Sequence, residues 1–283
     1  MFKKEELLKR MDKMINRFII ITTRFIETSA SPYGLLNSLK GNPSDKLHLS
    51  YDFEYFALTK SLKSLIAIRD LLKSGHNEDA IILLRSIFEN YLSCRFYNEN
   101  PEEADEFIRN PIRLSMAFYN VNSSGEIVNR DNQVQGEIRN PSAFKLGKDK
   151  GYFFVFYDIL SQFAHCNFSI YDCYLDNEYS YVVDKVNYEV EARLYTLFVF
   201  SKLFEHVVTV EGEEFYTIVL KKSCFKLVGD SQKFIREVFT ALIEEINKTQ
   251  SDFNKYKDKR LKNMYKDMLK SLNEELGSIK KDK

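Results

Sequence analysis

The chain has 283 residues, 44% of them hydrophobic, and its 41 lysine and arginine residues balance its 41 aspartate and glutamate residues. A chain of this length can bury a hydrophobic core without disulfide bonds or a structural metal. Its zero net charge creates no overall field that would attract nucleic acid or an anionic membrane, so binding to either must come from a local group of residues.

The first predicted element is an amphipathic helix from Lys3 to about Ile26, in which hydrophobic residues recur at three- and four-residue spacing. Its acidic start is unlike a secretory signal, and the four cysteines include no C-x-x-C pair, so we expect a protein of the reducing cytoplasm. Residues 28–50 contain prolines, glycines and many serines, a composition that predicts a loop.

Two helices, Asp52 to Lys73 and about Glu78 to Tyr97, are predicted to form a helical hairpin. Gly75 follows the first helix in the position of a left-handed C-terminal cap, and Asn77 is expected to cap the second helix. The second helix is strongly apolar, so we expect it to be the central helix of the fold.

The middle of the chain contains the least regular patterns. A further helix is predicted from Asn100-Pro101, bent or ended by Pro111. Residues 121–150 are rich in glycine and polar residues and are predicted to form a loop, which could act as a mobile lid. Helical spacing resumes between Tyr152 and Cys166.

The last predicted helix of the bundle core is an apolar helix from Glu189 to Val210, which charged residues make unsuitable as a membrane span. A short β-hairpin is predicted within Phe215 to Val228, followed by a helix that Ser231 caps and a charged surface helix. We therefore predict an all-α helical bundle with three parts: an N-terminal helix and loop (1–50), a bundle core (51–210), and a C-terminal hairpin with a helical appendage (211–283).

Arg85 and Glu89 lie four residues apart on the apolar helix, so they face the same side. Buried charges are expected to pair, and removal of either member of a buried pair costs about 3 to 5 kcal/mol. Two interpretations stay open. The pair is a structural salt bridge, or Arg85 binds phosphate through parallel hydrogen bonds and Glu89 orients it.

A second candidate group consists of Tyr157, Ser161 and His165, which share one helical face, followed by Asn167. A histidine can transfer protons near neutral pH, and a serine or tyrosine one turn away can orient it or contact a substrate. The structural alternative is a helix cap or a hydrogen-bonding group of the core. The abundant aromatic residues between Gly151 and Tyr181 could likewise stack on bases or pack in the core.

Standard cofactor and catalytic motifs are absent from the sequence, which has no Walker loop, no G-x-G-x-x-G and no G-x-S-x-G. A metal site built from Glu89, His165 and Cys166 is conceivable, but no ligand pair at the spacing of H-E-x-x-H supports it. We therefore expect neither a cofactor nor a metal.

The sequence also carries a longer pattern, consisting of Gly75, Ala80, Leu-x-Arg-Ser-x-x-Glu at 83–89 and Ser-x-x-x-His at 161–165. Over about residues 61–167 this pattern resembles a bacterial family of helical proteins of unknown function. The layout of that family is similar to the HEPN helical bundles, many of which are ribonucleases of toxins and phage-defence systems.

HEPN enzymes typically place an arginine and a histidine a few residues apart and cleave RNA without metal. Arg69 and His76 come closest to that spacing, but Ser74-Gly75 interrupts the helix between them. No arginine lies shortly before His165.

The resemblance therefore implies an active centre assembled from Arg85, Glu89 and His165, with Tyr157, Ser161 and Asn167 contacting the substrate. It implies RNA as the substrate, and an antitoxin, another defence protein or a second copy of the chain as partners. The alternative is a non-catalytic interaction module, in which the same side chains hold the core together.

Overall fold

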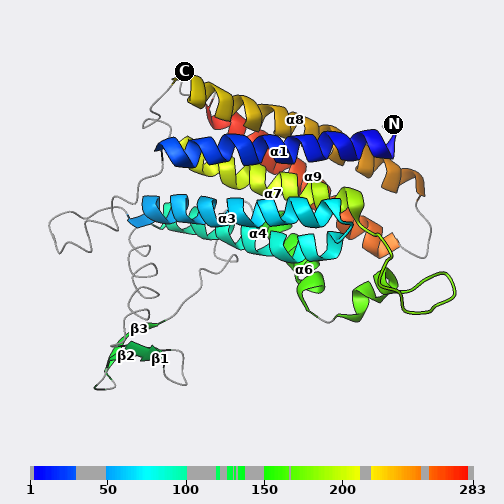
Figure 1. The fold of residues 1–283 in the computed structure, drawn as a ribbon, viewed down its shortest axis with the longest axis horizontal. Coiled ribbons are helices and arrows are strands. Elements are labelled where there is room, and N and C mark those ends of the chain that lie inside the picture. Colours follow the sequence, from blue (N-terminus) through cyan, green and yellow to red (C-terminus); the bar gives the residue numbers. More distant parts are fainter. Residues whose placement is uncertain are drawn as a thin grey trace.

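A computed structural model describes residues 3–29, 49–100, 119–121, 126–129, 131, 133–137, 150–165, 167–210, 218–249 and 255–279. Its elements, in chain order, are α1 (Lys4–Ser29), α3 (Leu49–Lys73), α4 (Asn77–Glu99), β1 (Tyr119–Val121), β2 (Glu126–Asn129), β3 (Val134–Glu137), α6 (Lys150–Ala164), η2 (Phe168–Tyr174), α7 (Glu189–Val210), α8 (Ile218–Thr249) and α9 (Lys255–Ile279). Long helices running side by side dominate the molecule (Figure 1), which confirms the predicted all-α packing.

Helix α7 lies at the centre of this packing and contacts α1, α3, α4 and α8. Its hydrophobic residues point to all sides of the helix, and Leu194, Leu197, Phe200 and Leu203 are fully buried. The central helix predicted after Gly75 is α4, and its packing against α6 and α7 is confirmed, but α7 contacts more helices than α4 does. Helix α4 packs against α3, α6 and α7 and keeps an exposed edge.

The C-terminal helices belong to the same hydrophobic core, which differs from the peripheral position expected for them. On α9, Tyr265 is buried, and its hydroxyl lies 3.0 Å from that of Tyr195 on α7. Lys202 of α7 is also buried and donates from Nζ to the carbonyl oxygen of Ser271 at 3.3 Å. Among the described helices, none has the length and hydrophobicity needed to cross a membrane.

The β-hairpin predicted within Phe215 to Val228 is not formed, because the chain is helical from Ile218 onward. Cys224, Leu227 and Val228 follow helical spacing and are buried. The β-branched residues around Ile218 favour a strand, but they form only a short run. The burial of Cys224, Leu227 and Val228 against the bundle outweighs this preference.

A small antiparallel sheet with strand order β1-β2-β3 lies apart from the helical layers (Figure 1). Residues 121–150 were predicted to form a loop, so β2 and β3 are a correction to that prediction. The turn between them is held by Asn129, whose Oδ1 accepts hydrogen bonds from the backbone N–H groups of Asp131 and Gln133 at 3.0 and 2.9 Å. The helix expected from Asn100-Pro101 lies outside the described residues.

The turn between α3 and α4 has the conformation that its glycine predicts. Gly75 has a φ of +82°, the left-handed region that glycine adopts without steric cost. Asn77, expected as a cap, instead uses its side-chain amide to donate to the carbonyl oxygen of Asn187 at 2.6 Å. The nearly buried Arg193 donates to Asp12 at 2.8 Å and to the carbonyl oxygen of Leu72 at 3.0 Å, so it joins α7, α1 and the end of α3.

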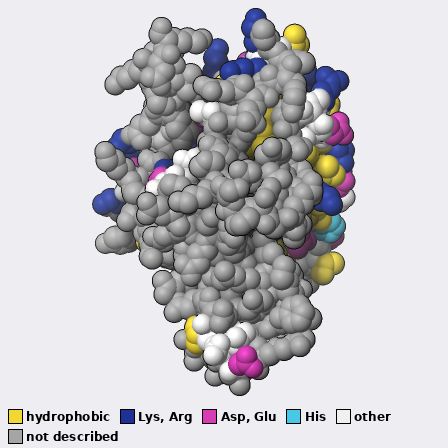
Figure 2. All heavy atoms as spheres, turned by 90° about the vertical axis from the view of Figure 1, so that its left-hand side faces the viewer, with side chains coloured by type: hydrophobic (Ala, Val, Ile, Leu, Met, Phe, Trp, Pro, Cys, Tyr) yellow, Lys and Arg dark blue, Asp and Glu magenta, His cyan; other side chains and the backbone are white. Residues whose placement is uncertain are grey.

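Charged side chains of both signs are visible on the described part of the face drawn in Figure 2. This distribution agrees with the zero net charge of the whole chain.

The buried thiols give a test of the packing. Burial raises the pKa of Cys94 well above its ordinary value, helped by the nearby Glu54 carboxylate, and raises the pKa of Cys224 to about 12. Since only the thiolate is alkylated readily, we expect both side chains to resist iodoacetamide in the native protein near neutral pH and to react after denaturation. Peptide mapping by mass spectrometry checks each site, and fast native labelling of either thiol would contradict its burial.

Candidate functional site

Helix α4 carries Arg85 and Glu89, and α6 carries Tyr157 and Ser161, whereas His165 and Asn167 follow the end of α6. The interface between α4 and α6 is filled by aromatic rings: Phe88 of α4 packs edge-on against Phe156 and Phe153 of α6, with ring centroids 5.0 and 6.0 Å apart. Arg85 and Tyr157 each lie within one turn of this contact. The aromatic packing therefore fixes the distance between the two helices at the site.

Arg85 is the hub of a four-residue group. Its Nη2 donates to the Tyr157 hydroxyl at 2.6 Å, and its Nε donates to Glu89 Oε1 at 3.1 Å. Its Nη1 lies 3.3 Å from His165 Nε2, and the Tyr157 hydroxyl also lies 3.2 Å from Glu89 Oε1. We call Arg85, Glu89, Tyr157 and His165 the Arg85 cluster. Three of its members are the predicted catalytic residues, and Tyr157 is a predicted substrate-binding residue.

The Arg85 cluster lies at the surface, although the sequence suggested that the charge pair would be buried. The side chain of Arg85 is 21% exposed and that of Glu89 is 47% exposed, and His165 is exposed as well. Helix α4 directs its apolar residues towards α3, α6 and α7, which leaves this strip at the rim. A ligand can therefore reach the cluster from solvent.

The cluster keeps Arg85 charged. Partial burial lowers the pKa of the guanidinium, but the hydrogen bonds to Tyr157 and Glu89 and the negative charge of Glu89 outweigh this effect, so the pKa of Arg85 is raised. The guanidinium also lies over the Tyr157 ring, with Cζ 4.8 Å from the ring centroid. A fixed positive charge held by neighbours on two helices is suited to binding an anion.

The contact between Arg85 and His165 defines one protonation state of the histidine. A guanidinium can only donate hydrogen bonds, so His165 Nε2 must accept and must carry no proton while this contact exists. The neutral ring then has its proton on Nδ1. An imidazole with a free pair of electrons at Nε2 is the form that can act as a general base.

The other two predicted site residues are not part of the cluster. Ser161 donates its hydroxyl proton to the carbonyl oxygen of Tyr157 at 2.6 Å, a bond to the preceding turn of its own helix that is common for serine. Asn167 caps η2, where its Oδ1 accepts from the N–H group of Ser169 at 2.9 Å. Asn167 and His165 both line a cavity, whereas Ser161 is not among the residues that line it.

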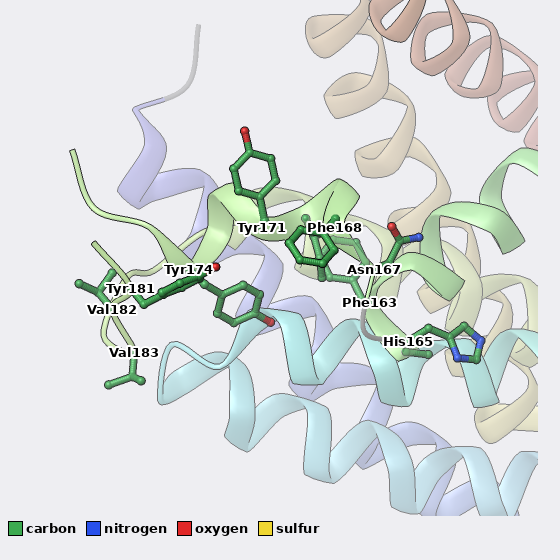
Figure 3. A pocket seen from close by; sticks show the side chains of 11 residues that line it. Phe163, His165, Asn167, Phe168, Tyr171, Tyr174, Tyr181, Val182 and Val183 are labelled. Carbon is green, nitrogen blue, oxygen red and sulfur yellow. The ribbon is translucent and has the colours of Figure 1, made fainter. Parts of the chain in front are cut away.

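The cavity has a volume of about 600 Å³ and is formed by the end of α6, by η2 and by the extended segment after it (Figure 3). Its lining residues are mostly aromatic or aliphatic: Phe163, Ala164, His165, Asn167, Phe168, Ile170, Tyr171, Tyr174, Tyr181, Val182 and Val183. We call it the aromatic cavity. In Figure 3, His165 lies at one end of it and Tyr181, Val182 and Val183 lie at the other.

Sequence reasoning included Tyr181 among the aromatic residues that could stack on bases, but it missed Val182 and Val183 as part of a site. The segment enters the cavity because Leu175 and Tyr181 pair as an antiparallel β-bridge, which folds the chain back on itself after η2. The run Tyr181-Val182-Val183 is a signal for this contact, since aromatic and β-branched residues favour extended backbone.

Two other arrangements considered from the sequence find no support in the described residues. Among them, no group of three or more histidine, cysteine, aspartate or glutamate side chains could hold a metal ion, and Cys166 lies outside them. Arg69 belongs to α3 and bonds to the adjacent Asp70, whereas His76 lies after the interruption at Gly75. The described structure therefore gives Arg69 and His76 no common helix.

The exposure of Arg85 and Glu89 predicts a weak coupling between them. For an exposed pair four residues apart on a helix, we expect a coupling free energy of about 0.3 to 1 kcal/mol, below the cost expected for a buried pair. A double-mutant cycle with Arg85→Ala and Glu89→Ala, measured by urea unfolding, checks this value. Arg95 and Glu99 form the same kind of pair on α4 at 3.0 Å and serve as the control cycle. A coupling of several kcal/mol would contradict the exposed placement.

Comparison with known proteins identifies a matching family for part of the chain. Residues 54–180 match a family described as a family of unknown function, DUF5677. The match contains α4 and α6, and with them every member of the Arg85 cluster and most of the aromatic cavity. No curated protein and no solved structure matches the chain.

Proposed function

We propose that the chain is a HEPN-like protein of toxin or phage-defence type that cleaves RNA without a metal ion. One observation carries this proposal: Arg85 contacts Glu89, Tyr157 and His165 over 2.6 to 3.3 Å, on an exposed rim. The cluster combines a permanent cation, a proton acceptor and a hydroxyl group. These are the chemical groups that RNA cleavage by its own 2′-hydroxyl requires.

The reaction can be written with the groups present. His165 removes the proton from the 2′-hydroxyl, and the 2′-oxygen forms a bond to phosphorus while the bond from phosphorus to the 5′-oxygen breaks. Tyr157 gives its proton to the departing 5′-oxygen, and the protonated His165 restores that proton to Tyr157 through solvent. Arg85 stabilises the negative charge of the phosphorane, and Glu89 orients Arg85. The products are a 2′,3′-cyclic phosphate and a 5′-hydroxyl.

The same proposal includes the place and the partners of the protein. We place it in the cytoplasm, where RNA is available and its thiols stay reduced. An antitoxin or another defence protein would restrain the activity, and a second copy of the chain is a candidate partner. The resemblance to HEPN bundles that the sequence suggested is the basis for this part of the proposal.

An interaction module without catalysis is the second candidate, and one feature of the cluster favours it. All three guanidinium nitrogens of Arg85 have contacts within the cluster, so the group also functions as a bridge between α4 and α6. In that case Arg85, Glu89 and His165 stabilise the bundle, and the exposed aromatic side chains contact a protein partner.

Incubation of the purified chain with total cellular RNA in the presence of a chelator separates the two candidates. We expect RNA fragments that carry cyclic phosphate ends, and slower growth of cells that express the chain. Intact RNA together with normal growth, for a chain shown to be folded by circular dichroism, would favour the interaction module.

A further inference from the structure

We propose that the aromatic cavity binds one unpaired nucleobase, that of the nucleotide whose phosphate lies at Arg85. This inference rests on the proposed function and names the substrate class: single-stranded RNA with at least one base free to leave its stack. It also assigns a role to side chains that the cleavage chemistry does not use, mainly Phe168, Tyr174 and Tyr181.

The aromatic side chains of the cavity are unusually exposed to solvent. Phe168 is 80% exposed, Tyr181 is 78% exposed and Tyr174 is 44% exposed, although all three line one cavity. Grouped aromatic surface in contact with water is unfavourable for a folded chain and is typical of a binding site. In Figure 3, Phe168 lies between the two tyrosines and His165.

Specific hydrogen bonds hold the wall of the cavity in place. Lys185 donates from Nζ to the carbonyl oxygens of Asp172 and Leu175, at 2.8 and 2.7 Å. Asn187 donates from its side-chain amide to the carbonyl oxygen of Cys173 at 2.9 Å. These contacts fix η2 against the segment that follows it. A wall that is already ordered loses little conformational entropy when a ligand binds.

The aromatic cavity is connected to Arg85, where the phosphate is proposed to bind. His165 lines the cavity, and its Nε2 lies 3.3 Å from Arg85 Nη1, so one residue belongs to both sites. A nucleotide with its phosphate at Arg85 would place its sugar near His165 and its base farther along, towards Phe168. The volume of about 600 Å³ lies within the range of ordinary small-ligand pockets, about 300 to 1,000 Å³.

The chemistry of the lining favours a base over a peptide side chain. Flat aromatic rings stack on nucleobases of any sequence, and tyrosine hydroxyls and the Asn167 amide can bond to the edge of a base. A base within a double helix cannot enter such a cavity, so the preferred strand is unpaired. An apolar peptide segment would gain nothing from the adjacent Arg85 charge.

The experiment measures binding without cleavage. The probes are two fluorescent 2′-O-methyl oligonucleotides, which cannot undergo cleavage through the 2′-hydroxyl: an oligoadenosine, and an abasic strand of the same length. We expect the wild-type chain to bind the oligoadenosine about 5- to 100-fold more tightly than the abasic strand. The double variant Tyr174→Leu/Tyr181→Leu should lose this preference. Phe56→Leu, which changes a 62% exposed aromatic residue on α3, is the matched control and should keep it.

The outcomes separate this inference from the proposed function. Arg85→Ala should weaken binding of both strands alike, because each carries the same phosphates. One outcome is that the wild-type chain prefers the oligoadenosine and Tyr174→Leu/Tyr181→Leu removes that preference, yet the wild-type chain cleaves no RNA. This result would support base binding in the aromatic cavity and overturn the proposed ribonuclease activity. Equal affinity for both strands, or no binding of either, would overturn the cavity even if RNA is cleaved. A wild-type chain that shows no base preference but self-associates, and a Tyr174→Leu/Tyr181→Leu variant that no longer self-associates, would identify the cavity as a protein interface. That result would also overturn the proposed base site.

Discussion

The variant His165→Asn is expected to lower the rate of RNA cleavage by about 100- to 10,000-fold, the usual contribution of a general acid or base. Asparagine retains polar atoms but cannot take up a proton near neutral pH. Because His165 is exposed and its polar contact with Arg85 is 3.3 Å long, the melting temperature should change little. The measurement is a single-turnover cleavage rate in chelator, together with a thermal melt of the same sample.

A matched control for this variant exists at the other exposed histidine near α4. His76 has a 61% exposed side chain at the start of that helix and lies outside the Arg85 cluster. His76→Asn should therefore leave the cleavage rate unchanged. A folded His165→Asn variant that still cleaves RNA at the wild-type rate would remove His165 from the chemistry.

The second large effect is expected for Arg85. Removal of a cationic donor aimed at the charge that develops in the transition state typically lowers a rate by about 100- to 1,000-fold, and Arg85→Ala should do the same here. Arg85→Lys retains the charge but not the planar set of donors that reaches Tyr157, Glu89 and His165 together. It should therefore recover only part of the lost rate.

Arg95 supplies the control for this experiment. It lies on α4, ten residues after Arg85, and its Nη2 forms the same type of ion pair with Glu99 at 3.0 Å. Arg95→Lys should leave cleavage within about twofold of the wild type, since Arg95 lies outside the Arg85 cluster and lysine keeps the positive charge beside Glu99. Equal losses for Arg85→Lys and Arg95→Lys would indicate a general effect on α4, and would contradict a specific role for Arg85.

The helical part of the fold was readable from the sequence, because long segments with three- and four-residue spacing have few alternatives. The helical structure at the start of α8 was not readable from the sequence. Ile218-Val219-Leu220 has the composition of a strand, but the segment is helical in the structure. The helix is favoured by the burial of Cys224 and Leu227 in the core, which the sequence does not show. The central place of α7 was equally hidden, since both α4 and α7 are apolar and the sequence does not show which one is surrounded on more sides.

The candidate site was partly predictable for a similar reason. Spacing on one helix placed Arg85 beside Glu89, and spacing on another placed Tyr157 near His165, but only the packing of Phe88 on Phe156 brings the two pairs together. The fate of Ser161 could not be foreseen, because a helical serine can bond to its own backbone or to a ligand. The contribution of Tyr181 depends on a chain reversal held by Asp176, whose Oδ1 accepts from the N–H groups of Glu178 and Ser180. These local signals do not show which part of the fold the segment packs against.

The account is tested most directly by the ends of the RNA that the wild-type chain produces in the presence of a chelator. Cleavage through the 2′-hydroxyl predicts a 2′,3′-cyclic phosphate on one fragment and a 5′-hydroxyl on the other, and it predicts that a single 2′-deoxy substitution at the cleaved position blocks the reaction there. Mass spectrometry of a defined oligoribonucleotide gives both results. Fragments with 5′-phosphate ends, cleavage that stops when the chelator is added, or an oligoribonucleotide left intact by the folded protein would contradict the account.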